Sequence, residues 1–346
     1  MADTAAIIER RPWNSIGWMI SWLPSWCPTS PNQLRTAEEK MLEYITGDVS
    51  KQYVPISGGN MLWTITLNGS VKDKTPLVLL HGFGGGVGLW ALNLDTLAQQ
   101  RPVYAFDLLG FGQSSRPQFS SDALEAEFQF VDCIEQWRVN AGLEDMILLG
   151  HNFGGYLAAA YSLKFPTRVK HLVLVEPWGI PERPEDQGQA EPVWIRALGA
   201  LLSPFNPLAG LRLAGPLGPT LVSTLRPDFK KKYSSVFSDN RVTDYIYHLN
   251  VQTPSGETAF RNMTIPYGWA KRPLLRRLAL HQAGTPITVI YGSRSSIDGN
   301  SGSAIKEMRP NSHVEIIAVR GAGHYMFADQ PEDFNRSVLQ VCDALG

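Results

Sequence analysis

The segment that most constrains the fold spans residues 146–161, where an apolar run, a glycine-rich turn and a second apolar run follow one another directly. The first run, Met146 to Leu149, is short and aliphatic, which indicates a buried strand. The second run, Tyr156 to Tyr161, indicates the start of a helix. Between them lies Gly150-His151-Asn152-Phe153-Gly154-Gly155, whose glycines let two backbones approach closely. The sequence therefore predicts strand, tight turn and helix, with Asn152 at the apex of the turn.

The same order is typical of a G-x-S-x-G nucleophile elbow, in which a strained turn raises a serine above the edge of a sheet. Asn152 stands at the position of that serine. A carboxamide has no hydroxyl to deprotonate, so no acyl-enzyme is expected by the serine route. Because asparagine tolerates positive φ, an ordinary tight turn is the alternative interpretation.

Apolar strand-like runs alternate with helical stretches from residue 76 onward, which is typical of a mostly parallel sheet covered on both faces. This order matches an α/β-hydrolase core, and the predicted fold class is therefore α/β, of the α/β-hydrolase type. The expected strands are Pro76 to Leu80, Val103 to Asp107, Met146 to Gly150, Leu172 to Glu176, Ile287 to Tyr291 and Val314 to Val319, after a weaker pair at Val54 to Ile56 and Trp63 to Leu67.

The alternation lapses after Pro177 into a segment rich in proline, glycine and aromatic residues, which we interpret as an inserted lid over the sheet. Within it, Pro204 to Pro219 is apolar and contains helix breakers, so short helices joined by turns are expected. The predicted organisation is a lead-in at 1–45, a first core part at 46–176, a lid at 177–284 and a second core part at 285–346.

A glycine-rich loop, His81 to Gly86, follows the strand that ends at Leu80. Loops at this position donate one backbone N–H to an oxyanion hole, so Phe83 and Phe153 are the expected donors. A phosphate cradle or a flexible loop is the alternative, but the Lys-Ser/Thr pair of a P-loop is missing.

Two further strand ends complete a degenerate triad. The loop after the penultimate strand contains Asp298, and the loop after the last strand ends in His324. The chain order Asn152, Asp298, His324 reproduces the nucleophile, acid and histidine order of α/β-hydrolases with only the nucleophile changed. Taken singly, each residue is as well explained by an ordinary loop.

The overall charge and the cysteines narrow the possible partners and compartment. The 346 residues carry a formal net charge of −1, which gives no reason to expect nucleic-acid binding. Cys27, Cys133 and Cys342 are odd in number and lack metal or redox spacing, which favours a cytoplasmic location and no bound metal. The apolar stretch Ile16 to Cys27 is too short to span a bilayer and lacks the features of a secretory signal.

Four tryptophans lie in the first 26 residues, at Trp13, Trp18, Trp22 and Trp26. The last three are spaced by four, so they would share one face of a helix, although two prolines argue against a continuous helix. Tryptophan favours membrane interfaces, so we expect a kinked or looped anchor in a lipid monolayer. Packing of these rings on the folded core is the alternative.

Five segments together resemble the α/β-hydrolase domain-containing protein family, and within it the lipid-droplet coactivators of adipose triglyceride lipase. The resemblance runs through nearly the whole chain, and it implies a protein that lies on lipid droplets and activates a separate lipase. A sister branch holds serine in the elbow and hydrolyses phospholipids, so asparagine favours the coactivators. The five segments are Trp22 to Ser30, Leu80 to Gly86, Phe106 to Gly112, Gly150 to Asn152, and Gly323 to His324.

The resemblance also implies partners and an alternative activity. The implied partners are adipose triglyceride lipase, a perilipin-type coat protein and the lipid monolayer, with no cofactor. The family has been credited with acylating lysophosphatidic acid from acyl-CoA through a His-x4-Asp pattern, here His324 and Asp329. Such a pair activates a hydroxyl only if its side chains face each other, and Asp329 is alternatively expected to start or cap the final helix.

Exposed loops carry the last candidates. Arg294 and Gly323 lie beside the degenerate triad, so we expect them to contact the lipase. Ser234 and Ser235 follow three lysines in a pattern typical of basophilic kinase sites, where phosphorylation would add negative charge. A solvated turn is the alternative there.

A third function class, an esterase with another nucleophile, requires Ser114, Ser115 or a deamidated Asn152. Nothing in the sequence places either serine at the elbow. The sequence therefore favours a catalytically dead hydrolase fold over the acyltransferase, and the acyltransferase over the esterase.

Overall fold

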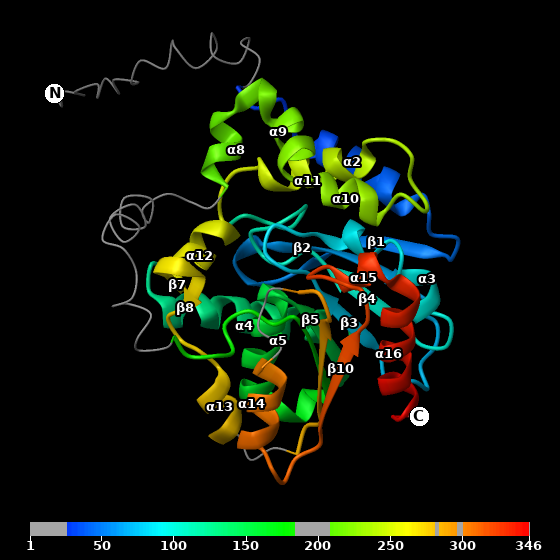
Figure 1. The fold of residues 1–346 in the computed structure, drawn as a ribbon, viewed down its shortest axis with the longest axis vertical. Coiled ribbons are helices and arrows are strands. Elements are labelled where there is room, and N and C mark those ends of the chain that lie inside the picture. The colour runs from blue at the N-terminus through cyan, green and yellow to red at the C-terminus, as the bar shows by residue number, and fades with distance from the viewer. Residues whose placement is uncertain (1–25, 184–207, 281–283, 296–299, 346) are drawn as a thin grey trace, which may run out of the picture.

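The computed structural model describes residues 26–183, 208–280, 284–295 and 300–345, which form a twisted sheet with helices on both faces (Figure 1). The eight strands lie in the order β1-β2-β4-β3-β5-β6-β9-β10. Strand β2 is antiparallel to both neighbours, and the strands from β4 to β10 are parallel. The predicted fold class is therefore confirmed. The strands are β1 (Val49–Pro55), β2 (Met61–Leu67), β3 (Leu77–Leu80), β4 (Val103–Phe106), β5 (Met146–His151), β6 (Val169–Val175), β9 (Ile287–Gly292) and β10 (Val314–Val319).

Strand β3 shows why central strands read as continuous apolar runs. All four of its residues are buried, because successive side chains point to opposite faces and helices cover both. Leu77 and Leu79 join one hydrophobic core, and Val78 and Leu80 join the other. The helices around the two cores are α2 (Pro31–Leu42), α3 (Leu94–Leu97), α4 (Ala123–Asn140), α5 (Phe153–Lys164), α14 (Asn300–Met308), α15 (Met326–Asp329) and α16 (Pro331–Asp343).

Three strands begin earlier than the sequence predicts, and β2 is one of them, beginning at Met61 rather than Trp63. Strand β1 begins at Val49 rather than Val54, and its residues Ser50 to Tyr53 are exposed. It lies at the edge of the sheet, so it needs no apolar run. Strand β6 begins at Val169 rather than Leu172. The prediction missed its first residues because the exposed Lys170 interrupts the apolar pattern.

The segment between β6 and β9 contains short elements, as its helix breakers predict. Helices α8 to α11 gather with α2 at one end of the molecule, and α2 packs against α11 (Figure 1). Whether this segment acts as a lid, and where its domain boundaries fall, stay predictions. The elements are α8 (Ala209–Leu213), α9 (Gly218–Leu225), α10 (Pro227–Lys232), α11 (Arg241–Asn250), α12 (Gly256–Asn262), β7 (Thr264–Ile265), β8 (Trp269–Ala270) and α13 (Leu275–Leu280).

The turn between β5 and α5 brings two backbones into direct contact. A Cβ atom at Gly154 would lie 2.5 Å from the carbonyl oxygen of His81 and 2.6 Å from that of Leu80. Neither oxygen can move without shifting the end of β3. Glycine at this position therefore lets the first turn of α5 rest on the strand that leads into the glycine-rich loop.

We predict that Gly154→Ala lowers the free energy of unfolding by about 3 kcal/mol, because overpacking against fixed backbone typically costs about 1–3 kcal/mol and sometimes more. Urea unfolding at neutral pH measures the change. The matched control is Gly210→Ala in α8, where no atom lies within 4 Å of the added Cβ. Equal stability of the two variants would show that the close approach is not a constraint.

Candidate functional site

Asn152 lies at the apex of the β5–α5 turn with φ 52° and ψ −114°. This ψ lies outside the left-handed helical region that asparagine tolerates, so the turn is a strained one rather than an ordinary tight turn. Its backbone N–H donates to Val175 at 2.9 Å, and its carbonyl accepts from Tyr156 and Trp178. These three hydrogen bonds hold the strained turn to β6, to the first turn of α5 and to the segment after β6.

The Asn152 side chain contacts the glycine-rich loop. The backbone N–H of Phe83 donates to Oδ1 of Asn152 over 3.3 Å. Phe83 is one of the two oxyanion donors expected from the sequence; the other, Phe153, begins α5 and is buried. The side-chain oxygen of Asn152 therefore accepts the N–H that, in an active hydrolase, would donate to the substrate oxyanion.

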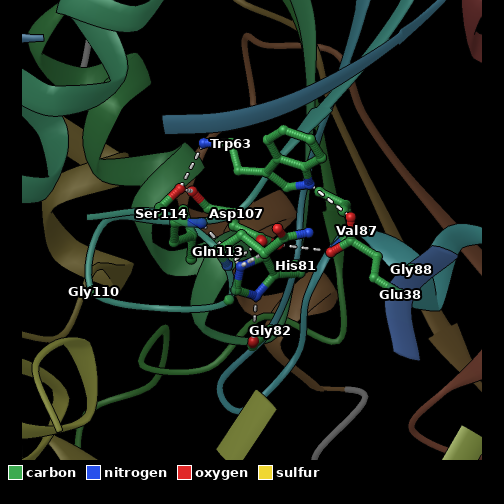
Figure 2. A network of polar contacts seen from close by, with 12 residues as sticks. Glu38, Trp63, His81, Gly82, Val87, Gly88, Asp107, Gly110, Gln113 and Ser114 are labelled. Atoms are coloured by element: carbon green, nitrogen blue, oxygen red, sulfur yellow. Dashed lines mark hydrogen bonds and ion pairs between the residues drawn. The ribbon is translucent and has the colours of Figure 1, made fainter. Parts of the chain in front are cut away.

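A buried polar network supports this loop from behind (Figure 2). His81 accepts a hydrogen bond from the Leu108 N–H at Nε2, 3.0 Å, and its Nδ1 lies 2.8 Å from the Gly82 carbonyl, so Nδ1 carries the proton. Burial lowers the pKa of His81 to about 4. Asp107 accepts from the Val87 N–H at 2.9 Å, and burial raises the pKa of Asp107 to about 6.

Glu38 joins the same network from α2, and nothing in our sequence analysis identified it. Its Oε1 accepts from the indole of Trp63 at 2.6 Å, and its Oε2 accepts from the Tyr245 hydroxyl of α11 at 3.4 Å. Burial, followed by the negative charge of Asp107, raises the pKa of Glu38 to about 8. The available signal was an acidic residue on the face of α2 that buries Leu34 and Met41.

His324 lies in the loop between β10 and α15 and faces a carboxylate that the sequence analysis missed. Its Nδ1 is 3.6 Å from Oε2 of Glu176, which directly follows β6. Asp298, the acid expected from the sequence, lies outside the described residues. The signal for Glu176 was a carboxylate at the end of the apolar run Leu172 to Val175, at the same edge of the sheet as the elbow.

Asp329 has other partners than the His-x4-Asp pattern requires. Its Oδ2 accepts from the Gly323 N–H at 2.8 Å, and its Oδ1 pairs with Lys232 of α10 at 2.5 Å. The expectation that Asp329 starts or caps the final helix is wrong. Asp329 ends α15, Gln330 takes the cap position of α16, and the carboxylate bonds instead to the loop before it.

Arg294 and Gly323 come together. The backbone N–H of Arg294 donates to the carbonyl of Ala322 at 2.9 Å, and Arg294 and Gly323 both line a polar cavity of about 410 Å³. Helix α10 forms the opposite wall through Lys231 and Lys232. Just beyond it, Ser234 and Ser235 are exposed, and the Ser234 hydroxyl donates to the Lys231 carbonyl at 2.8 Å.

A second, more apolar cavity of about 520 Å³ lies over the glycine-rich loop. Phe83 and Tyr325 line it together with side chains of α8, α9, α10 and α11. Val222 and Phe229 are among these lining residues and are buried. The glycine-rich loop, whose Phe83 contacts Asn152, thus borders a space of the size and polarity that suit an apolar ligand.

The remaining sequence candidates are at a distance from the elbow or outside the description. Ser114 is 4% exposed; its hydroxyl donates to the Asp107 carbonyl at 2.6 Å and accepts from the Trp63 N–H at 2.9 Å. The Ser115 hydroxyl accepts from the Met61 N–H, so both serines connect β2 to the loop after β4. Trp26 is 66% exposed and donates from its indole to Leu213 of α8 at 3.1 Å. The other three tryptophans of the expected anchor, Trp13, Trp18 and Trp22, lie outside the described residues.

Comparison with known proteins agrees with this geometry. The family described as alpha/beta hydrolase fold matches residues 75–331. The solved naproxen esterase from Bacillus subtilis aligns with a TM-score of 0.65 and 17% identity, over 90% of this chain and 97% of the esterase. A bacterial membrane phospholipase A aligns with a TM-score of 0.63 and 20% identity, over 96% and 95%. At these identities the two structures establish the fold alone.

Curated relatives are much more similar in sequence. A human protein named 1-acylglycerol-3-phosphate O-acyltransferase ABHD5 is 64% identical over 331 residues, 95% of each chain. A Bos taurus protein named (Lyso)-N-acylphosphatidylethanolamine lipase is 50% identical over 347 residues, 100% of each chain. The chain therefore belongs to the α/β-hydrolase fold family, and within it to the group that includes these two relatives, as the resemblance implied.

We predict that Glu38→Gln flattens the dependence of stability on pH between pH 6.5 and 8. Because the pKa of Glu38 is raised from 4.5 to about 8 on folding, the native state binds a proton that the unfolded state has lost. Its contribution is complete below pH 4.5 and is lost as pH rises through 8, about 1.5 kcal/mol of it between pH 6.5 and 8.

Urea unfolding at the two pH values measures this difference, with Glu39→Gln on the exposed face of α2 as the control. In this window folded His81, with a pKa of about 4, stays neutral, and folded Asp107, with a pKa of about 6, is already mostly ionised. A wild-type slope that survives in Glu38→Gln would contradict the assignment of a protonated Glu38.

Proposed function

We propose that this member of the α/β-hydrolase family is catalytically dead as a serine hydrolase, lies on lipid droplets and activates a separate triacylglycerol lipase. The observation that carries the proposal is the strained elbow with asparagine at its apex. Its side chain offers an amide where an acyl-enzyme would need a hydroxyl. Its Oδ1 also lies against the Phe83 N–H.

The rate loss that is expected when the serine nucleophile is absent supports a non-hydrolytic role. In a serine protease, loss of the nucleophile costs on the order of a million-fold in rate, and the remaining groups retain roughly 10³–10⁴-fold over water. Efficient turnover of an ester is therefore not expected here. The apolar cavity beside the glycine-rich loop is still able to bind an acyl chain, so the site can sense a lipid without cleaving it.

Lipase contact is proposed at the polar cavity that holds Arg294 and Gly323. A Cβ atom on Gly323 would lie 3.3 Å from Oδ2 of Asp329, which already pairs with Lys232. A side chain at position 323 would therefore press on the carboxylate that links α10 to this loop. The cavity is bounded by loops and a helix end, which suits recognition of another protein.

Attachment to lipid is proposed for the tryptophan-rich segment up to Trp26, together with a perilipin-type coat protein as a second partner. Trp26 is 66% exposed beside Leu213, which is 73% exposed, so both offer apolar surface. Among the residues that the structure describes, no helix has the length and apolarity to cross a bilayer. A shallow, peripheral mode of attachment from the cytoplasm is therefore proposed.

The second candidate function is transfer of an acyl group from acyl-CoA to 1-acylglycerol-3-phosphate. It is favoured by the name of the 64% identical relatives and needs no serine. The His-x4-Asp pair gives it little support, because Asp329 is bonded to Gly323 and Lys232.

The test is hydrolysis of emulsified triacylglycerol by adipose triglyceride lipase alone, by this protein alone and by the two together. We expect stimulation only in the mixture, and we expect Arg294→Glu to abolish it because the reversed charge faces the proposed contact. Arg336→Glu, on the exposed surface of α16, is the matched control and should stimulate like the wild type.

Three outcomes would count against the proposal. Hydrolysis by this protein alone would contradict the interpretation of Asn152. Full stimulation by a correctly folded Arg294→Glu variant would move the lipase contact elsewhere. No stimulation by the wild type, with acyl transfer from acyl-CoA to 1-acylglycerol-3-phosphate in a parallel assay, would favour the acyltransferase.

A further inference from the structure

Glu176 is a carboxylate held in an unusual backbone conformation. It follows β6 with φ 43°, a left-handed value that is uncommon for residues other than glycine, and it is 2% exposed. Its N–H donates to the Ile290 carbonyl at 3.0 Å, which fixes it against the neighbouring strand β9. Neither of the functions proposed above uses this residue.

Both oxygens of Glu176 have defined partners in the loop that follows β9. Oε1 accepts from the Gly292 N–H at 2.9 Å, and Oε2 accepts from the Ser295 hydroxyl at 2.9 Å. These two bonds orient the carboxylate so that Oε2 also faces Nδ1 of His324, 3.6 Å away.

His324 has no other partner for that nitrogen in the part of the chain that the structure describes. Its Nδ1 is buried and makes no hydrogen bond there. Asp329 is engaged by Gly323 and Lys232. In a histidine–acid pair, a carboxylate that faces Nδ1 holds the proton on that nitrogen and leaves Nε2 free to act as a base.

We propose that Glu176, positioned by Gly292 and Ser295, is the carboxylate that orients His324, and that the two form an intact acid–base pair next to the elbow, where the His324 ring lies 4.6 Å from that of His151. Such a pair takes the proton of a hydroxyl group onto Nε2, and the imidazolium that results is stabilised by the Glu176 carboxylate, whose Oε2 faces Nδ1–H at 3.6 Å and closes to a hydrogen bond when the ring is charged. The ligand class that it fits is an alcohol or water whose oxygen lies against His324. Glu176 is a positioning residue in this account, and the pair does not depend on lipase activation.

The test is nitrogen-15 NMR of the histidine rings in the full-length protein, which has seven histidines, with His324→Gln to assign the signal. We expect wild-type Nδ1 of His324 to carry a proton in a hydrogen bond. In Glu176→Gln, the amide keeps its oxygen on the Gly292 N–H and turns its NH₂ toward Nδ1, so we expect the proton to move to Nε2. Asp298→Asn and Asp329→Asn should leave the wild-type tautomer in place.

Ser295→Ala provides a milder perturbation if Glu176→Gln fails to fold. It removes one bond to Oε2 and should weaken the hydrogen-bonded Nδ1–H signal without abolishing it. Loss of the Nδ1–H signal in Asp298→Asn, or its persistence unchanged in folded Glu176→Gln, would overturn the proposal. The NMR signal requires no lipase, so this outcome is separate from success or failure of the coactivation assay.

Discussion

The close packing of backbone at the β5–α5 turn is the constraint on which the rest of the site depends. Gly154 rests on the last carbonyls of β3, and a Cβ atom on Gly82 would lie 2.7 Å from His151 and 2.9 Å from Asn152. Only glycine at these positions allows the strained turn and the glycine-rich loop to lie side by side. That contact brings the Asn152 carboxamide to the Phe83 N–H, so the architecture that would activate a serine instead holds an amide against an oxyanion donor.

Buried carboxyl groups organise the surroundings of this turn in two different ways. Glu38 keeps its proton because it is buried, and it links α2, β2 and α11. Glu176 lies at the carboxyl end of β6, where it accepts two hydrogen bonds and faces His324. The first links α2 to the segment that follows β6, and the second orients the loop after β10. The proposed coactivator would thus retain most of a hydrolase framework while lacking its nucleophile.

The fold was predictable from the sequence because central strands such as β3 and β5 are apolar on both faces, and the elbow glycines occupy positions set by backbone contact. Glu176 and Glu38 were not predicted, since a single acidic residue at the end or on one face of an apolar element has no sequence pattern that separates it from a solvated one. Asp329 shows the opposite error. Its spacing from His324 suggested a pair, but only the folded chain brings Gly323 and Lys232 to the carboxylate.

The most direct test of the central claim, that this site contains no activated serine nucleophile, is intact-mass measurement after incubation with a fluorophosphonate ester. Such a reagent phosphonylates a serine that a neighbouring base has activated, and a serine esterase treated in parallel serves as the positive control. The account predicts an unchanged mass for this protein while the esterase gains one phosphonyl group. A stoichiometric adduct on this chain, mapped to Ser114, Ser115 or any other serine, would contradict it.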